Sequence, residues 1–83
     1  MFATLLGFVA GTVTVVSFVP QVVRAWRTRQ TRDLSFGAFS LLAFGATLWL
    51  VYGVLTHDGP VIATNLSVVV LVSAILIAKL RFG

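Results

Sequence analysis

The stretch FATLLGFVAGTVTVVSFVPQVV, residues 2–23, decides the fold because it carries no charged side chain over 22 positions. Two further uncharged, apolar stretches follow at residues 36–55 and 60–78. An α-helix rises about 1.5 Å per residue, so about 20 residues cross the roughly 30 Å hydrocarbon core of a bilayer. Backbone groups in lipid must form their hydrogen bonds within the segment. We therefore predict an all-α integral membrane protein, with three membrane-spanning helices in a single unit of residues 1–83.

The composition agrees with a membrane protein. Hydrophobic residues make up 59% of the 83-residue chain and charged residues only 10%, against about 25% charged residues in soluble domains. A soluble domain of this size buries too small a share of its surface to hide so many apolar side chains. No basic residue precedes the first stretch, which is also longer than a signal-peptide core, so we expect it to remain as a helix.

All the basic side chains belong to one side of the predicted bundle. They lie in the connection after the first stretch and at the C-terminal end, at Arg24, Arg27, Arg29, Arg32, Lys79 and Arg81. Three crossings put these two regions on the same side, and positive residues collect on the cytoplasmic side. The sequence therefore predicts a protein of the cell (inner) membrane, with its N-terminus outside and its C-terminus in the cytoplasm. Nucleic-acid binding is a poorer explanation of the net charge of +4, because a short juxtamembrane connection suits anionic lipid headgroups better.

The remaining polar residues near the predicted helix ends indicate turns and caps. The Asp-Gly-Pro run at 58–60 is typical of a turn that leads into a helix with proline in its first turn, and Ser35 is a candidate N-cap. His57 is expected to be exposed, and Trp26 to anchor the chain at the membrane interface. The chain has no cysteine and no evident metal-ligand set or nucleophile–base pair, so we predict neither an enzyme nor a cofactor or metal site.

Each predicted helix carries one face of small, polar or aromatic residues. At 100° per residue, the three faces consist of Gly7, Gly11, Thr14, Phe18 and Gln21; Ala38, Leu41, Gly45, Trp49 and Tyr52; and Asn65, Val69, Val72, Ser73 and Leu76. Gly7 and Gly11 form a GxxxG pair, which lets another helix approach closely. Ordinary helix packing explains Gly7, Gly11 and Gly45 as well as a specific interface does.

Trp49 and Asn65 lie deeper than residues of their types usually do. Trp49 is about six residues before the end of the second stretch and Asn65 about five after the start of the third, so both reach roughly 7–9 Å inside the same side. Tryptophan normally sits at the interface, and an amide in lipid needs a partner or a wet cavity. An aromatic face for the C–H groups of a pyranose, with an amide for its hydroxyls, favours sugar binding. An interhelical hydrogen bond is the alternative role for Asn65.

Pro20 interrupts the first stretch near its basic end. Proline has no N–H and its ring clashes with the carbonyl four residues earlier, that of Val16, so a kink is expected. The apolar run continues through Val22 and Val23, and proline is tolerated in membrane helices. Pro20 with the following Gln21 is therefore a candidate hinge, although a static bend is equally allowed.

In combination, these motifs resemble the SemiSWEET family of PQ-loop sugar transporters. The matching segments are SFVPQV at 17–22, TRQTRDLS at 28–35, WLVYG at 49–53 and Asn65. Together they cover essentially the whole chain. The Pro-Gln pair alone would be a weak signal, whereas the combination with its spacing is specific.

The resemblance implies a three-helix unit that pairs as a parallel homodimer around a central path. It implies that Trp49 and Asn65 bind the sugar and that Pro20 and Gln21 form the hinge. Residues of the gate or cavity would be Phe18, Tyr52 and Asp58. A two-fold interface uses the same patch on both subunits, which suits the face that carries the GxxxG pair.

The expected activity is transport of mono- or disaccharides, of the glucose or sucrose class, by alternating access. Proton-coupled carriers usually need an ionisable group within the membrane, and no Asp, Glu, Lys, Arg or His lies within a predicted span; we therefore expect uniport. One alternative is a PQ-loop carrier of another small polar solute, such as a cationic amino acid, although no buried acidic partner is present. The other is a membrane assembly subunit that transports nothing.

Overall fold

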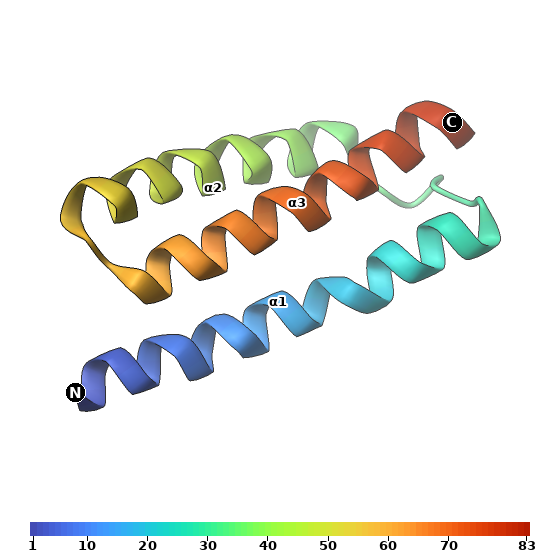
Figure 1. Cartoon of the computed structure of the whole chain (residues 1–83). Helices are drawn as coiled ribbons and strands as arrows, with labels where there is room; N and C mark the ends of the chain where they lie inside the picture. The colour runs from blue at the N-terminus through green and yellow to red at the C-terminus, as the bar shows by residue number, and fades with distance from the viewer.

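Three long helices and no strand make up the structure, a computed structural model that describes all residues 1–83. Helix α1 runs over Phe2–Thr28, α2 over Phe36–Thr56 and α3 over Gly59–Phe82 (Figure 1). All three are long and apolar enough to cross a membrane, so the predicted all-α membrane fold is confirmed. Helix α1 continues beyond the apolar stretch to Thr28, because the residues that follow Val23 are tolerated in a helix whether or not lipid surrounds them.

The helix ends are fixed by local hydrogen bonds. The Ser35 hydroxyl accepts a hydrogen bond from the Ala38 N–H at 3.1 Å, which confirms the predicted N-cap. Asp58 caps α3 in the same way, since its carboxylate accepts from the Val61 N–H at 3.2 Å. Arg29 and His57 end α1 and α2 in the left-handed conformation, and in each case the N–H of that residue donates back to a carbonyl of the last turn.

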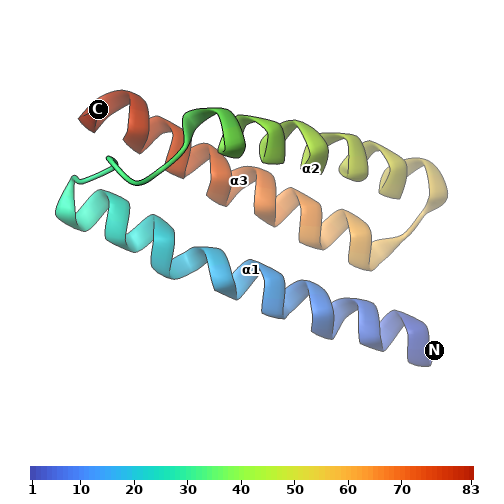
Figure 2. The same ribbon diagram turned by 180° about the vertical axis from the view of Figure 1, so that it is seen from behind.

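Helix α3 lies between α1 and α2, as both views of the ribbon show (Figures 1 and 2). Helices α1 and α2 each pack on α3 and do not pack on each other. The N-terminus lies at the same end as the α2–α3 turn, His57–Asp58, and we call this the turn end. The α1–α2 loop, residues 29–35, lies with the C-terminus at the opposite end, which we call the loop end.

The buried side chains concentrate on the central helix. Val72, Ile75 and Ala78 of α3 are fully buried, but only nine of the 83 residues are buried in all. The chain measures 43 × 20 × 14 Å along its principal axes, too slender to enclose a large interior. Most apolar side chains of α1 and α2 therefore face outward and need lipid or another protein to cover them.

Candidate functional site

Two aromatic side chains form an exposed pair on α2. Trp49 and Tyr52 lie one turn apart, and their rings meet edge to face with centroids 5.4 Å apart and planes 84° apart. Each keeps about half of its surface exposed, 55% for Trp49 and 53% for Tyr52. An edge-to-face contact of this kind fixes both rings and leaves ring surface free for a ligand.

Asn65 lies on α3 at a depth similar to that of Trp49. It is six residues from Gly59 and Trp49 is seven from Thr56, which places both roughly 9–11 Å from the turn end. The Asn65 amide donates from Nδ2 to the Val61 carbonyl at 2.9 Å, a bond within α3 and not between helices. Its Oδ1 makes no hydrogen bond within the chain, so an acceptor and the second N–H remain for a ligand or partner.

Pro20 lies inside a helix that continues on both sides of it. Its missing N–H leaves α1 one backbone hydrogen bond short at this level. The neighbouring Gln21 is exposed, whereas Phe18 is half-buried and packs against the apolar cluster of Ala46, Val68 and Val72. Phe18 thus joins α1 to the core at the level of the proposed hinge.

The GxxxG pair packs inside the chain. A Cβ added to Gly7 would come within 2.9 Å of the Pro60 side chain, and one added to Gly11 would overlap the Thr64 side chain. Both glycines therefore let α1 approach α3 closely. Of the two roles that the sequence left open for Gly7 and Gly11, helix packing within the chain is the one that these contacts support. Gly45 differs, since a Cβ there would meet nothing within 4 Å.

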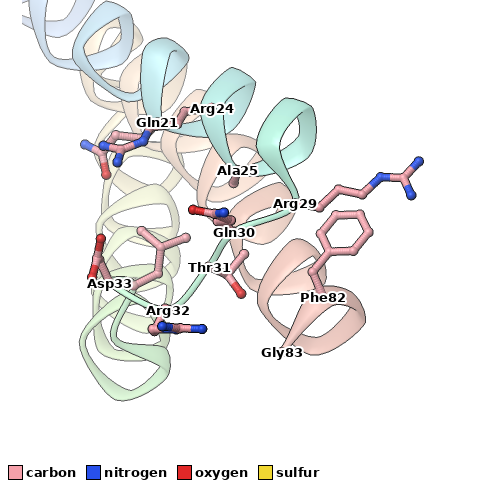
Figure 3. Close-up of a pocket in the computed structure, with 11 residues that line it drawn as sticks. Gln21, Arg24, Ala25, Arg29, Gln30, Thr31, Arg32, Asp33, Phe82 and Gly83 are labelled. Atoms are coloured by element: carbon pink, nitrogen blue, oxygen red, sulfur yellow. The ribbon is translucent and has the colours of Figure 1, made fainter.

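Two cavities lie at the ends of the bundle. The one at the loop end has a volume of about 610 Å³ and is lined by Gln21 and by polar and basic loop residues (Figure 3). The one at the turn end has a volume of about 500 Å³ and includes His57 and Asp58. Neither of these two cavities contains Trp49 or Asn65; Trp49 is exposed on α2 and Asn65 is half-buried on α3.

The structure also assigns partners to residues that the sequence could not pair. Trp26, expected as an interface anchor, donates from Nε1 to the Ala74 carbonyl of α3 at 3.1 Å. Lys79 donates from Nζ to the Thr31 carbonyl of the loop at 2.7 Å. Both contacts join residues 48 positions apart, and no local pattern in a single sequence signals such a pairing. Gly53 was likewise missed as a packing residue, although a Cβ there would come within 2.8 Å of Val61.

Comparison with known proteins places the chain among membrane transporters. Residues 2–62 match the family model of the PQ loop repeat. The sugar transporter SemiSWEET of Bradyrhizobium diazoefficiens is 44% identical over 95% of this chain and 92% of its own length. The sugar transporter SemiSWEET of Leptospira biflexa is 44% identical over 95% of this chain and 93% of its own length.

Solved structures agree with the sequence relatives. A bacterial homologue of SWEET transporters superimposes with a TM-score of 0.95 at 37% identity, over all of both chains. SemiSWEET in an inward-open conformation superimposes with a TM-score of 0.87 at 28% identity, over 96% of this chain and 86% of the other. These relatives are named as transporters and not as enzymes. The three-helix fold, the Pro-Gln motif and the matched relatives together show that the chain belongs to the SemiSWEET family of PQ-loop proteins.

Proposed function

We propose that this chain transports sugars as one half of a parallel homodimer. The observation that carries the proposal is the exposed Trp49–Tyr52 pair, whose Trp49 lies at a depth similar to that of Asn65, with its unpaired Oδ1 and second N–H. A pyranose offers an apolar C–H face and a rim of hydroxyl groups. An aromatic ring suits the first, and an amide that can both donate and accept suits the second. The names of the relatives as sugar transporters support this substrate class.

A second copy of the chain completes the site. Trp49 and Asn65 line neither of the two cavities at the ends of the bundle, and three helices with nine buried residues do not enclose a sugar. A two-fold axis beside α2 and α3 would bring two Trp49 and two Asn65 around one central cavity. The open surface at Gly45 supports close approach of the partner on this side.

The loop end is the cytoplasmic end in this proposal. It carries all six basic side chains, in or next to the α1–α2 loop and near the C-terminus, and positive residues collect on the cytoplasmic side of the inner membrane. The N-terminus then lies outside the cell and the C-terminus in the cytoplasm, as the charge pattern predicts.

Transport proceeds by alternating access. Pro20 and Gln21 lie between the site and the loop end and provide the hinge, because α1 lacks a backbone hydrogen bond there. Tyr52 lies one turn closer to the turn end than Trp49, and Asp58 lies at that end itself, so both are placed to gate the outer side. Phe18 lines the path beside the hinge. Substrate and outer gate thus lie on α2 and α3, whereas the hinge lies on α1.

The chain works as a uniporter in this proposal. None of its acidic, basic or histidine side chains lies between residues 2 and 23, 36 and 55, or 60 and 78, and proton-coupled carriers usually hold such a group within the membrane. An imposed pH step across proteoliposomes should therefore drive no accumulation of sugar, and accumulation would contradict uniport.

Exchange of radiolabelled glucose and sucrose in proteoliposomes tests the function. Trp49→Ala and Asn65→Ala should each reduce exchange by about tenfold or more, the factor expected when an aromatic anchor or a hydrogen-bonding group is lost from a site. Val51→Ala is the matched control, because Val51 is similarly exposed at 51% and points about 200° away from Trp49 around the helix.

Three outcomes would overturn the proposal. Wild-type exchange equal to that of protein-free vesicles would exclude both sugars. Exchange of a cationic amino acid in their place would favour another PQ-loop carrier. Loss of assembly in Trp49→Ala, with no transport by the wild type, would favour a subunit that only packs against other proteins.

A further inference from the structure

Two hydrogen bonds at the loop end join α3 to α1 and to the loop that follows α1. The Trp26 Nε1–H of α1 donates to the Ala74 carbonyl of α3, and the Lys79 ammonium of α3 donates to the Thr31 carbonyl of the loop. The bonds run in opposite directions, and their partners are five residues apart in each segment, about 7.5 Å along α3. Among the side-chain hydrogen bonds of the chain, only these two join segments distant in sequence. We call this pair the loop latch.

Thr31 is buried, although it lies in the α1–α2 loop. Loop residues normally lie on the surface, yet Thr31 is only 2% exposed and its Oγ1 has no hydrogen-bond partner. A buried hydroxyl without a partner costs free energy, so other contacts must hold the residue in place. The bond from Lys79 to its carbonyl is one such contact, and a charged donor makes a stronger hydrogen bond than a neutral one.

Aromatic contacts surround the latch. The Trp26 ring packs edge to face on Phe82, with centroids 5.3 Å apart. The Arg29 guanidinium lies over the same Phe82 ring at 5.8 Å from its centroid (Figure 3), and that of Arg81 lies at 5.9 Å. Arg81 thus shares this end of α3 with Lys79 but makes no hydrogen bond to the loop.

The latch lies on the far side of Pro20 from the glycine contact. Gly7 and Gly11 fix the turn-end half of α1 against α3, and Trp26 lies six residues beyond Pro20, about 9 Å along the helix. A helix held to one neighbour on both sides of a hinge cannot bend there unless one attachment opens. The glycine contact is close packing, whereas the latch consists of two hydrogen bonds.

We infer that the latch is the attachment that opens, and that Lys79 and Trp26 are positioning residues that set when the α1 segment beyond Pro20 leaves α3. Its role in transport rests on the function proposed above; the opening itself does not. While the latch is closed, Thr31 is buried and the loop is held against the end of α3. When it opens, Thr31 becomes exposed and α1 is free to bend at Pro20.

Thr31→Cys provides a direct probe of the opening. The Thr31 hydroxyl makes no hydrogen bond and the latch uses the backbone carbonyl, so the substitution preserves the latch. The chain has no other cysteine, and a water-soluble maleimide therefore reacts at this position alone. In the Thr31→Cys background, Lys79→Ala should accelerate labelling by about tenfold or more, as expected for loss of a hydrogen bond from a charged donor.

Matched variants separate the latch from general loosening. Lys79→Arg keeps a charged donor and should restore slow labelling. Trp26→Phe keeps the ring but removes the N–H, and should accelerate labelling less than Lys79→Ala. Arg81→Ala should leave the rate unchanged. If the maleimide reacts no faster in Lys79→Ala than in Arg81→Ala, the inference that the latch controls this opening is overturned.

Sugar exchange by the same variants tests the role in transport. Lys79→Ala should slow exchange severalfold while sugar affinity, measured by tryptophan fluorescence, stays within about twofold, because the variant shifts the conformational equilibrium and leaves the site intact. Faster labelling with unchanged exchange would overturn the role in transport. Faster labelling of a protein whose wild type exchanges neither glucose nor sucrose would support the latch and contradict the proposed function.

Discussion

Helix α1 meets α3 in two regions that rely on different physics. At the turn end, Gly7 and Gly11 let the helix backbones approach until Pro60 and Thr64 fill the space where side chains would lie. At the loop end, Trp26 joins α1 to α3 by a hydrogen bond, and Lys79 joins α3 to the loop that follows α1. Close packing has no alternative arrangement of similar energy nearby, because its atoms already fill the available space.

Hydrogen bonds behave differently when they open. Their donors and acceptors can pair with water or headgroups after they separate, so the net cost of opening is small, about 0.5–1.5 kcal/mol for a typical bond and somewhat more for a charged donor. In the proposed mechanism, Pro20 therefore separates a fixed half of α1 from a half that can be released. A transporter needs such a division, since one part must hold the fold while another moves.

The largest effect should come from filling the glycine contact. Gly11→Ala would place a methyl group where the Thr64 side chain lies, and overpacking of this kind typically costs about 1–3 kcal/mol. We expect a clear fall in the free energy of unfolding, measured by titration with SDS in detergent micelles.

A second substitution makes this result specific to the helix contact. Thr64→Ala removes the hydroxyl and methyl groups that meet the new Cβ, so the double variant Gly11→Ala/Thr64→Ala should recover much of the lost stability. Additive losses in the double variant would show that α1 does not pack on Thr64 as described.

The next largest effect should come from the hinge. Pro20→Ala would restore the missing N–H and stiffen α1, so sugar exchange should fall by up to about tenfold while the stability of the protein stays the same or rises. Val19→Ala is the control, because Val19 is adjacent, exposed and has its backbone N–H. Unchanged exchange in Pro20→Ala would remove the hinge role and leave Pro20 as a static feature of the helix.

The features that the sequence predicted correctly depend on local chemistry or on the bilayer. The number and order of the helices follow from the lengths of the three uncharged stretches, and Ser35 caps α2 because a cap involves only residues within one turn. The family was identified by a different route, the resemblance of several motifs in combination to the SemiSWEET family, which the relatives confirm.

The features that it missed depend on which helices become neighbours. Helical periodicity placed Gly7 and Gly11 on one face but could not state that α3 of the same chain would cover it. Trp26 was predicted at the interface because tryptophan prefers that depth, and its partner Ala74 carries no side-chain signal. The Lys79–Thr31 bond ends on a backbone carbonyl, which every residue has, so no residue type marks the acceptor.

The smallest effect should come from Gly45, which extends the comparison to the face that α3 leaves open. A Cβ there meets nothing within the chain, so Gly45→Ala should not destabilise the monomer and should add up to about 1 kcal/mol of helix propensity. If a second copy approaches this face, the methyl group should instead weaken dimerisation in detergent, measured by the dependence of cross-linking on protein concentration. Gly37 also has no neighbours within 4 Å, so Gly37→Ala should gain stability without any weakening of dimerisation. Equal dimerisation in both variants would show that the partner packs on another face. Gly45 would then lie outside the dimer interface that completes the sugar site.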